Sequence, residues 1–137
     1  MTAIRFTVPG VAVPKARARV VKTPAGKTVS FTPGKTARFE HWVRLCAKEV
    51  QPEKLLDCPL ILEVVFYLKR PRSRPKRDQY PDRKPDLDNL VKAVKDACNG
   101  FLWTDDARIV DIVARKRYGD PPRVEVVVRE VEEKVEC

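Results

Sequence analysis

The chain has 137 residues, the length of one ordinary domain, and 43% of them are hydrophobic while 34% are charged. No stretch is long and apolar enough to cross a bilayer, and the first ten residues lack the apolar run of a signal peptide, so we expect one compact domain, residues 1–137, in the cytoplasm. Lysines and arginines number 28 against 19 aspartates and glutamates, and this net charge of +9 favours a polyanionic partner such as nucleic acid.

The first thirty residues predict a strand followed by a hairpin. Residues 4–8 are rich in β-branched side chains and end at a Pro-Gly pair, which is typical of a strand end. Residues 17–21 and 28–32 flank an Ala-Gly turn. We therefore expect these two segments to form the arms of a hairpin, with basic or hydroxyl side chains on both arms.

A first helix is expected over about residues 36–50. Apolar side chains recur there at helical spacing, Thr36 is a candidate N-cap, and Pro52 ends the pattern. His41 lies on this helix and is the single histidine of the chain. With no second histidine to share a metal ion, we interpret His41 as a surface or packing residue.

The composition changes abruptly in the middle of the chain. Residues 60–68 (LILEVVFYL) carry one charge among β-branched and aromatic side chains, so we expect a central strand buried on most of both faces. Residues 69–85 combine several prolines with a strongly basic, polar run. Such a segment cannot pack a core, so we expect an exposed basic loop.

The last part of the chain predicts a helix and two strands. Residues 87–98 place apolar side chains on one side and charged side chains on another, and an Asn-Gly pair ends the pattern. Residues 109–118 and 124–131 are β-branched and are joined by G-D-P-P, so we expect an antiparallel hairpin. The order of elements predicts an α+β fold, a mixed β-sheet with two main helices.

The four cysteines are far apart and form no C-x-x-C pair. They are Cys46, Cys58, Cys98 and Cys137. Together with a single histidine, this spacing disfavours a zinc site. Free, buried thiols are expected, because disulfides are rare in a reducing compartment.

Two pairs of aspartates stand out in this basic chain. Asp86 and Asp88 lie where the proline-bearing loop becomes a helix, and there aspartate ordinarily caps the helix or complements its dipole. Asp105 and Asp106 follow an aromatic-rich turn, through which the chain would return toward the helix. Clustered carboxylates repel one another unless a cation lies between them, and without a nearby histidine Mg²⁺ or Mn²⁺ is favoured over zinc.

Lys92 follows Asp88 by four residues and therefore shares its helix face. One interpretation is an ordinary surface ion pair, worth roughly a few tenths of a kcal/mol. The other places the Lys92 ammonium over a scissile phosphate, where it offsets charge that develops in the transition state. Asp96, one turn further along, would then be a supporting residue that orients Lys92.

The chain also carries three longer motifs. They are P-D-x-D-N-L at 85–90 with Lys92 and a D-A pair at 96–97, W-x-D-D-A at 103–107, and P-K-x-R-x-R at 14–19 with F-T-P-x-K-T-x-x-F-E-x-W at 31–42. Together they make the chain resemble the RusA family of Holliday junction resolvases. The resemblance spans most of the chain and keeps the order of elements, so it is more specific than a lone D-x-D.

The resemblance implies a homodimeric, Mg²⁺-dependent endonuclease, with Mn²⁺ as a substitute ion, encoded by a cell or a prophage. Such an enzyme resolves four-way DNA junctions in recombination and repair by paired nicks in strands of like polarity. By motif position, Asp86, Asp88 and Asp106 correspond to the metal-binding catalytic carboxylates. Lys92 corresponds to the functionally important lysine, and Asp105 matches an acidic position with a supporting role.

Basic residues of the N-terminal motifs and of the loop would hold the DNA backbone by charge and shape rather than by base sequence. They are Lys15, Arg17, Arg19, Lys35, Arg70, Arg72, Arg74, Lys76, Arg77, Arg83 and Lys84. Two departures from the family's pattern leave junction and cleavage-site preference open. The segment from the helix to Trp103 is one residue shorter than in the family's pattern, and the basic loop is longer than in that pattern.

Two rival interpretations remain open. If the aspartates only cap helices, the chain is a non-catalytic, basic nucleic-acid-binding module. In the second interpretation the chain is a different metal-dependent enzyme: another nuclease or phosphohydrolase, or a glycosyltransferase that holds a nucleotide through D-x-D. The chain has neither a P-loop nor a G-x-G-x-x-G motif, which would be expected for a dedicated nucleotide pocket.

Overall fold

A computed structural model of the chain describes residues 3–16, 19–31 and 33–132. In this part of the chain two α-helices accompany a mixed four-stranded sheet and a separate two-stranded hairpin, which confirms the expected α+β fold. The elements are β1 (Ala3–Pro9), β2 (Arg19–Lys22), β3 (Thr28–Phe31), α1 (Gly34–Ala47), the 3-10 helix η1 (Lys48–Val50), β4 (Leu60–Leu68), α2 (Leu87–Cys98), the 3-10 helix η2 (Asp106–Arg108), β5 (Ile109–Tyr118) and β6 (Arg123–Glu130).

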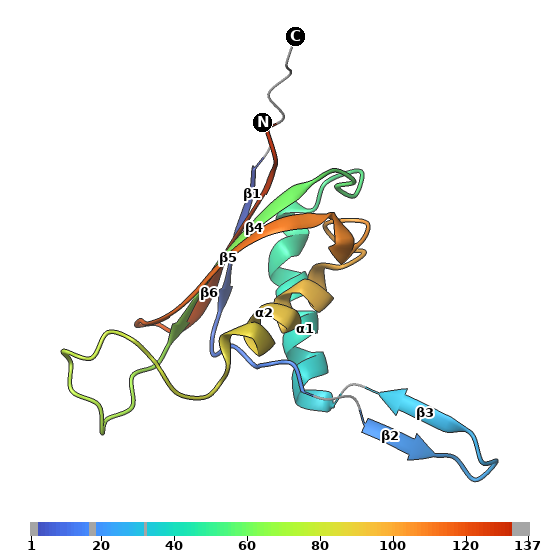
Figure 1. Ribbon diagram of the computed structural model, residues 1–137, viewed down its shortest axis with the longest axis horizontal. Helices are drawn as coiled ribbons and strands as arrows, with labels where there is room; N and C mark the ends of the chain where they lie inside the picture. Colours follow the sequence, from blue (N-terminus) through green and yellow to red (C-terminus); the bar gives the residue numbers. More distant parts are fainter. Residues whose placement is uncertain (1–2, 17–18, 32, 133–137) are drawn as a thin grey trace.

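The sheet has the strand order β1-β6-β4-β5. Strand β4 runs parallel to β5 and antiparallel to β6, and β6 runs antiparallel to β1. Both helices lie on the same face of this sheet, whereas the β2–β3 hairpin projects away from the body of the molecule (Figure 1). The hairpin predicted around the Ala-Gly turn is therefore confirmed for β2 and β3, while residues 17, 18 and 32 of the predicted arms lie outside the described residues.

The core lies between the sheet and its two helices. Strand β4 occupies the central position that its composition predicts, but its burial alternates strictly from Leu60 to Leu68. The expectation of burial on most of both faces is wrong, because the helices cover one face and leave the other side chains half-buried. Five buried apolar side chains of β4 thus face the helices: Leu60, Leu62, Val64, Phe66 and Leu68.

The antiparallel hairpin expected at the end of the chain is also wrong. Both β5 and β6 exist at nearly the predicted positions, but β4 lies between them and pairs with each. The short G-D-P-P connection therefore passes the end of β4, where the Gly119 N–H donates to the Leu68 carbonyl at 3.0 Å. A Cβ at Gly119 would lie 2.6 Å from the Tyr67 ring, so a glycine is required at this close approach.

Helix α1 begins two residues earlier than predicted. Its N-cap position is held by Pro33, and the Thr36 side chain makes no capping bond. Instead, the buried Thr36 hydroxyl donates to the Pro14 carbonyl and accepts from the Ala16 N–H, both at 3.3 Å. Thr36 therefore attaches the segment after β1 to the start of α1.

The remaining sequence predictions concern single residues. Helix α2 has the expected bounds, and Gly100 follows its end with a φ of +73°. His41 is exposed on α1. Cys98 is a buried free thiol, Cys46 and Cys58 are half-buried free thiols, and Cys137 lies outside the described residues. No helix in the described part of the chain is long and apolar enough to span a membrane.

Candidate active site

A groove of about 570 Å³ lies between α2 and β5, which we call the α2–β5 groove. Its charged side chains come from α2 and η2, and its apolar side chains come from α2 and β5. The lining residues are Leu87, Asp88, Val91, Lys92, Lys95, Asp96, Asp106, Ile112 and Ala114. The groove therefore collects Asp88, Asp96 and Asp106, three of the five aspartates that the sequence singled out, together with Lys92, against one apolar wall.

Helix α2 supplies its charged residues from one stripe. Asp88 precedes Lys92 by four residues, and Lys95 and Asp96 follow Lys92 by three and four, so all four lie on the same side of the helix. The opposite side is buried against the core from Leu90 onward. The burial of one face therefore fixes the direction in which the charged face points.

Asp106 enters the groove from the turn after α2. The indole N–H of Trp103 donates to Asp106 Oδ1 at 2.8 Å, and Trp103 is fully buried. Backbone bonds to the segment before β4 fix this turn, because the Leu56 N–H donates to Leu102 and the Leu56 carbonyl accepts from Thr104. A rigid donor thus orients one carboxylate oxygen of Asp106 and leaves the other available.

Cys98 is close to this carboxylate but is not available as a nucleophile. Burial, with a smaller contribution from the negative charge of Asp106, raises the pKa of the Cys98 thiol to about 12. The thiol is therefore protonated at neutral pH, and a buried, protonated thiol is a poor nucleophile.

Asp86 is placed differently from the other aspartates. It occupies the N-cap position of α2 but makes no capping hydrogen bond, and it is not part of the groove lining. Its exposed carboxylate lies 3.1 Å from Lys84 Nζ. Just before it, Lys116 Nζ on β5 donates to the carbonyls of Arg83 and Pro85, both at 2.9 Å, and so fixes the entry to α2.

Among residues 3–16, 19–31 and 33–132, no three His, Cys, Asp or Glu side chains lie together as a ready metal site. The structure brings Asp88 and Asp106 into one groove and leaves Asp86 at its helix end and Asp105 exposed. The carboxylates in the groove offer oxygen donors only. This donor set fits Mg²⁺, which usually takes one or two protein carboxylates and completes its shell with water or phosphate.

The predicted DNA-binding side chains that the structure describes fall into two groups. Lys35, Arg72, Lys76, Arg77, Arg83 and Lys84 are exposed. By contrast, Arg74 is taken up by Asp78 and Asp82, Arg70 donates to the Asp78 carbonyl, and Lys15 contacts two carboxylates. Arg17 and the side chain of Arg19 lie outside the described residues.

Sequence reasoning did not identify every residue of this site. Lys95 lines the groove and Lys116 holds the entry to α2, yet neither was singled out. A signal existed for Lys116, since it follows the groove residues Ile112 and Ala114 at two-residue spacing and therefore shares their face of β5. The contact of Lys15 with Asp96 joins segments far apart in the chain and leaves no local pattern.

Two comparisons with known proteins bear on this geometry. The family model described as "Endodeoxyribonuclease RusA" matches residues 9–129. The chain is also 37% identical to the uncharacterized protein YqaN of Bacillus subtilis (strain 168), over 96% of this chain and 99% of that protein. The family match covers the groove, both helices and strands β2 to β5, and β6 except Glu130, but of β1 only Pro9.

Proposed function

Because the chain belongs to the RusA endodeoxyribonuclease family, we propose that it is a divalent-metal-dependent endonuclease that resolves four-way DNA junctions by paired nicks, in recombination and repair. The observation that carries this proposal is the α2–β5 groove, which gathers Asp88, Asp106 and Lys92. Metal-dependent phosphodiester hydrolysis uses carboxylates to hold the metal ion and gains from a cationic side chain beside the phosphate, and the groove contains residues of both kinds.

Mg²⁺, or Mn²⁺ in its place, would be held by Asp88 and Asp106, with Asp86 as a third carboxylate at the start of α2. When bound, such an ion offsets charge on the phosphate and lowers the pKa of a coordinated water. Asp86 makes no capping bond, so its carboxylate is not committed to the helix backbone. That absence weakens the interpretation of Asp86 as a plain helix cap.

Lys92 would stabilise negative charge on the phosphate. Its side chain is 60% exposed, and its ammonium lies 3.3 Å from Asp96 at the groove. A surface ion pair of this kind contributes little to folding, about 0 to 1 kcal/mol. A phosphate entering the groove would therefore compete for Lys92 at small cost to stability.

The exposed basic residues would hold the DNA outside the groove. Lys35 and the exposed lysines and arginines of the 69–85 loop suit contacts with the phosphate backbone, which position DNA without reading its sequence. A symmetric homodimer would place two equivalent grooves on a junction that needs two equivalent cuts. We expect the protein to act on DNA in the cytoplasm, whether a cell or a prophage encodes it.

The test compares three DNA substrates of equal length: a mobile four-way junction, a linear duplex and a flap. Purified protein is incubated with each in Mg²⁺ or in chelator, beside the Asp106→Asn variant. We expect cleavage of the junction in Mg²⁺ only, and cleavage about a thousandfold slower by the variant. Equal cutting of all three substrates would contradict selectivity for the four-way junction but would still indicate a nuclease. Cutting in the presence of chelator would contradict the dependence on a divalent metal.

A non-catalytic DNA-binding module remains the second candidate. It is favoured by the lack of a ready three-residue metal cluster among the described residues. In the same experiment it predicts binding of the junction without nicking, and no difference between the wild type and the Asp106→Asn variant in Mg²⁺.

A further inference from the structure

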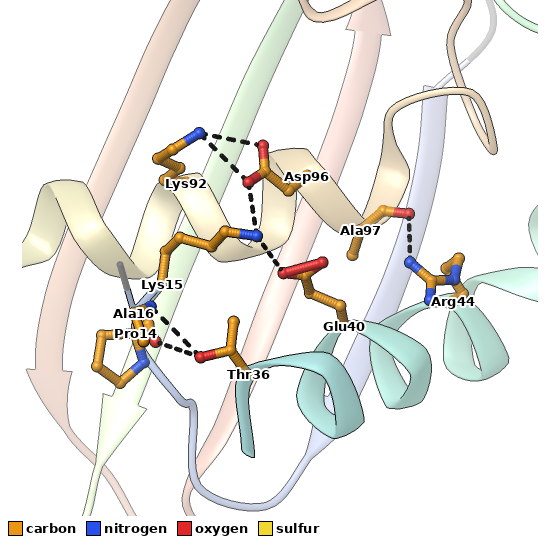
Figure 2. Close-up of polar contacts among 9 residues, drawn as sticks. All are labelled: Pro14, Lys15, Ala16, Thr36, Glu40, Arg44, Lys92, Asp96 and Ala97. Atoms are coloured by element: carbon orange, nitrogen blue, oxygen red, sulfur yellow. Dashed lines mark hydrogen bonds and ion pairs between the residues drawn. The ribbon is translucent and has the colours of Figure 1, made fainter. Parts of the chain in front are cut away.

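Four side chains of alternating charge contact one another in a row that ends at the α2–β5 groove: Glu40, Lys15, Asp96 and Lys92 (Figure 2). Lys15 Nζ lies 2.8 Å from Glu40 Oε2 and 3.1 Å from Asp96 Oδ2. Asp96 in turn lies 3.3 Å from Lys92 Nζ. The groups come from three segments: the stretch after β1, helix α1 and helix α2.

Exposure increases along this row of charges toward the groove. The side chains of Glu40, Lys15, Asp96 and Lys92 are 12%, 17%, 23% and 60% exposed. The Lys15–Glu40 pair is therefore partly buried, and water and salt screen such a pair less than one in solvent. Lys92 alone extends into solvent at the groove.

The backbone around Lys15 is fixed as firmly as its ammonium. The Lys15 N–H donates to the Asn89 carbonyl of α2 at 2.9 Å. On either side of it, Pro14 and Ala16 are both hydrogen-bonded to the Thr36 hydroxyl of α1 (Figure 2). The segment is thus bound to both helices, and the Lys15 side chain has a defined direction.

The charge of Lys15 is already balanced inside the protein. Burial lowers the pKa of Lys15, but hydrogen bonds to Glu40 and Asp96 outweigh burial and raise the pKa above its usual value. The ammonium is therefore fully charged at neutral pH. With two carboxylates in contact, it has little attraction left for a DNA phosphate.

We infer that Lys15 is a positioning residue for the reaction: held by Glu40, it fixes the Asp96 carboxylate so that Asp96 presents the Lys92 ammonium to the α2–β5 groove. This inference rests on the proposed function. It removes Lys15 from the residues that contact DNA directly and gives the N-terminal P-K-x-R-x-R motif a role inside the active site.

Loss of Lys15 would release the Asp96 carboxylate from its fixed orientation. Lys92 would then follow Asp96 over several rotamers, and a misplaced catalytic group is costly even when the displacement is small. We expect Lys15→Met to lower the single-turnover cleavage rate about tenfold, the size typical of supporting residues around a site. The affinity for the junction is expected to stay the same.

The test is a double-mutant cycle between Lys15→Met and Lys92→Met, measured as single-turnover cleavage of a four-way junction. If Lys15 acts through Lys92, the double variant cuts as slowly as Lys92→Met alone. Lys15→Arg restores part of the rate, and Lys54→Met, at an exposed lysine between α1 and β4, leaves it unchanged. Additive losses in the double variant, or weaker junction binding by Lys15→Met, would overturn the inference.

A second measurement does not depend on cleavage. Removing Lys15 alone leaves Glu40 buried without a partner, so Lys15→Met combined with Glu40→Gln is the variant to use if the single one unfolds. The side-chain NMR signal of Lys92 is expected to move toward that of a free lysine in these variants and to stay in place in Lys15→Arg. An unchanged Lys92 signal would contradict the inference, whether or not the wild type cuts the junction. A wild type that cuts no junction would by itself contradict only the proposed function.

Discussion

The α2–β5 groove and the basic loop of residues 69–85 are neighbours in the chain but obtain their structure in different ways. In the groove, the buried face of α2 and the fully buried Trp103 set the positions of the charged groups. In the loop, hydrogen bonds and ion pairs between polar groups set the positions of the charged side chains. Arg74 lies 3.3 Å from Asp78 and 2.8 Å from Asp82, and Arg70 donates to the Asp78 carbonyl at 2.7 Å.

The difference separates two tasks. Chemistry requires groups fixed within a fraction of an ångström, and rigid elements supply that precision. Holding a phosphate backbone requires charge near the DNA, and an exposed loop supplies it with looser geometry. Substitutions in the groove should therefore change the cleavage rate, whereas substitutions in the loop should change the affinity and its salt dependence.

The largest effect is expected for Asp106→Asn. Loss of this carboxylate should lower single-turnover cleavage by about a thousandfold, comparable to the loss of a strong transition-state contact. Junction binding should be retained or improved, because a negative charge near the phosphates is removed. Asp105→Asn is the matched control, since Asp105 is exposed and outside the groove lining. Loss of binding by Asp106→Asn would indicate that Asp106 is structural.

Lys92→Met should have the next largest effect. Without its ammonium, cleavage at saturating protein should slow by about a hundredfold, and the midpoint of urea unfolding should hardly move because the ion pair with Asp96 is exposed. Lys54→Met again serves as the control. A variant that cuts at the wild-type rate would reduce Lys92 to a surface charge.

Trp103→Phe tests whether the core sets the geometry of the groove. Removing the indole donor to Asp106 should slow cleavage about tenfold and reduce the free energy of unfolding by about 2 kcal/mol, because a fully buried side chain loses volume. Trp42→Phe is the control, since its indole donates to the Pro9 carbonyl and neither residue is part of the groove lining. An unchanged rate in Trp103→Phe would break the link between core packing and chemistry.

The loop is tested by replacing Arg72, Lys76 and Arg77 together by glutamine. These side chains are exposed, so the slope of log Kd against log salt should become shallower by roughly three, about one per lost phosphate contact. The cleavage rate at saturating protein should not change. A slower rate with an unchanged salt slope would place the loop in the chemistry and remove the contrast between the two regions.

The smallest effect concerns alkaline pH. The pKa of Cys98 is raised from 9.0 to about 12 by burial and by Asp106. In the unfolded chain the thiol ionises first, so its contribution to stability is complete below about pH 9 and is lost as pH rises toward 12. Cys98→Ala should therefore lose less stability than the wild type between about pH 8 and pH 10 in urea unfolding. Equal losses would contradict the raised pKa.

The sequence predicted well those features that depend on local pattern. Helix α2 has its predicted bounds because its apolar positions recur at helical spacing and an Asn-Gly pair ends it. Helix spacing and a returning turn also suggested that Asp88, Lys92 and Asp106 lie near one another, and all three line the groove, whereas Asp86, which the sequence grouped with them, does not.

Features that depend on tertiary pairing were predicted poorly. Nothing local indicates that β4 inserts between β5 and β6, because a short connection ordinarily joins neighbouring strands. Thr36 looks like an N-cap, but its hydroxyl finds backbone partners in the segment after β1. The contact between Lys15 and Asp96 likewise arises only when both helices have packed.

The central claim is that a divalent metal ion in the α2–β5 groove acts on the scissile phosphate. The most direct measurement replaces each non-bridging oxygen of that phosphate in turn by sulfur and compares single-turnover junction cleavage in Mg²⁺ and Mn²⁺. We expect one sulfur-substituted junction to be cut slowly in Mg²⁺ and to recover in Mn²⁺, which accepts sulfur more readily, with no recovery in Asp106→Asn. A cleavage rate that is the same with either sulfur substitution as without it, or cleavage that persists in chelator, would contradict the claim.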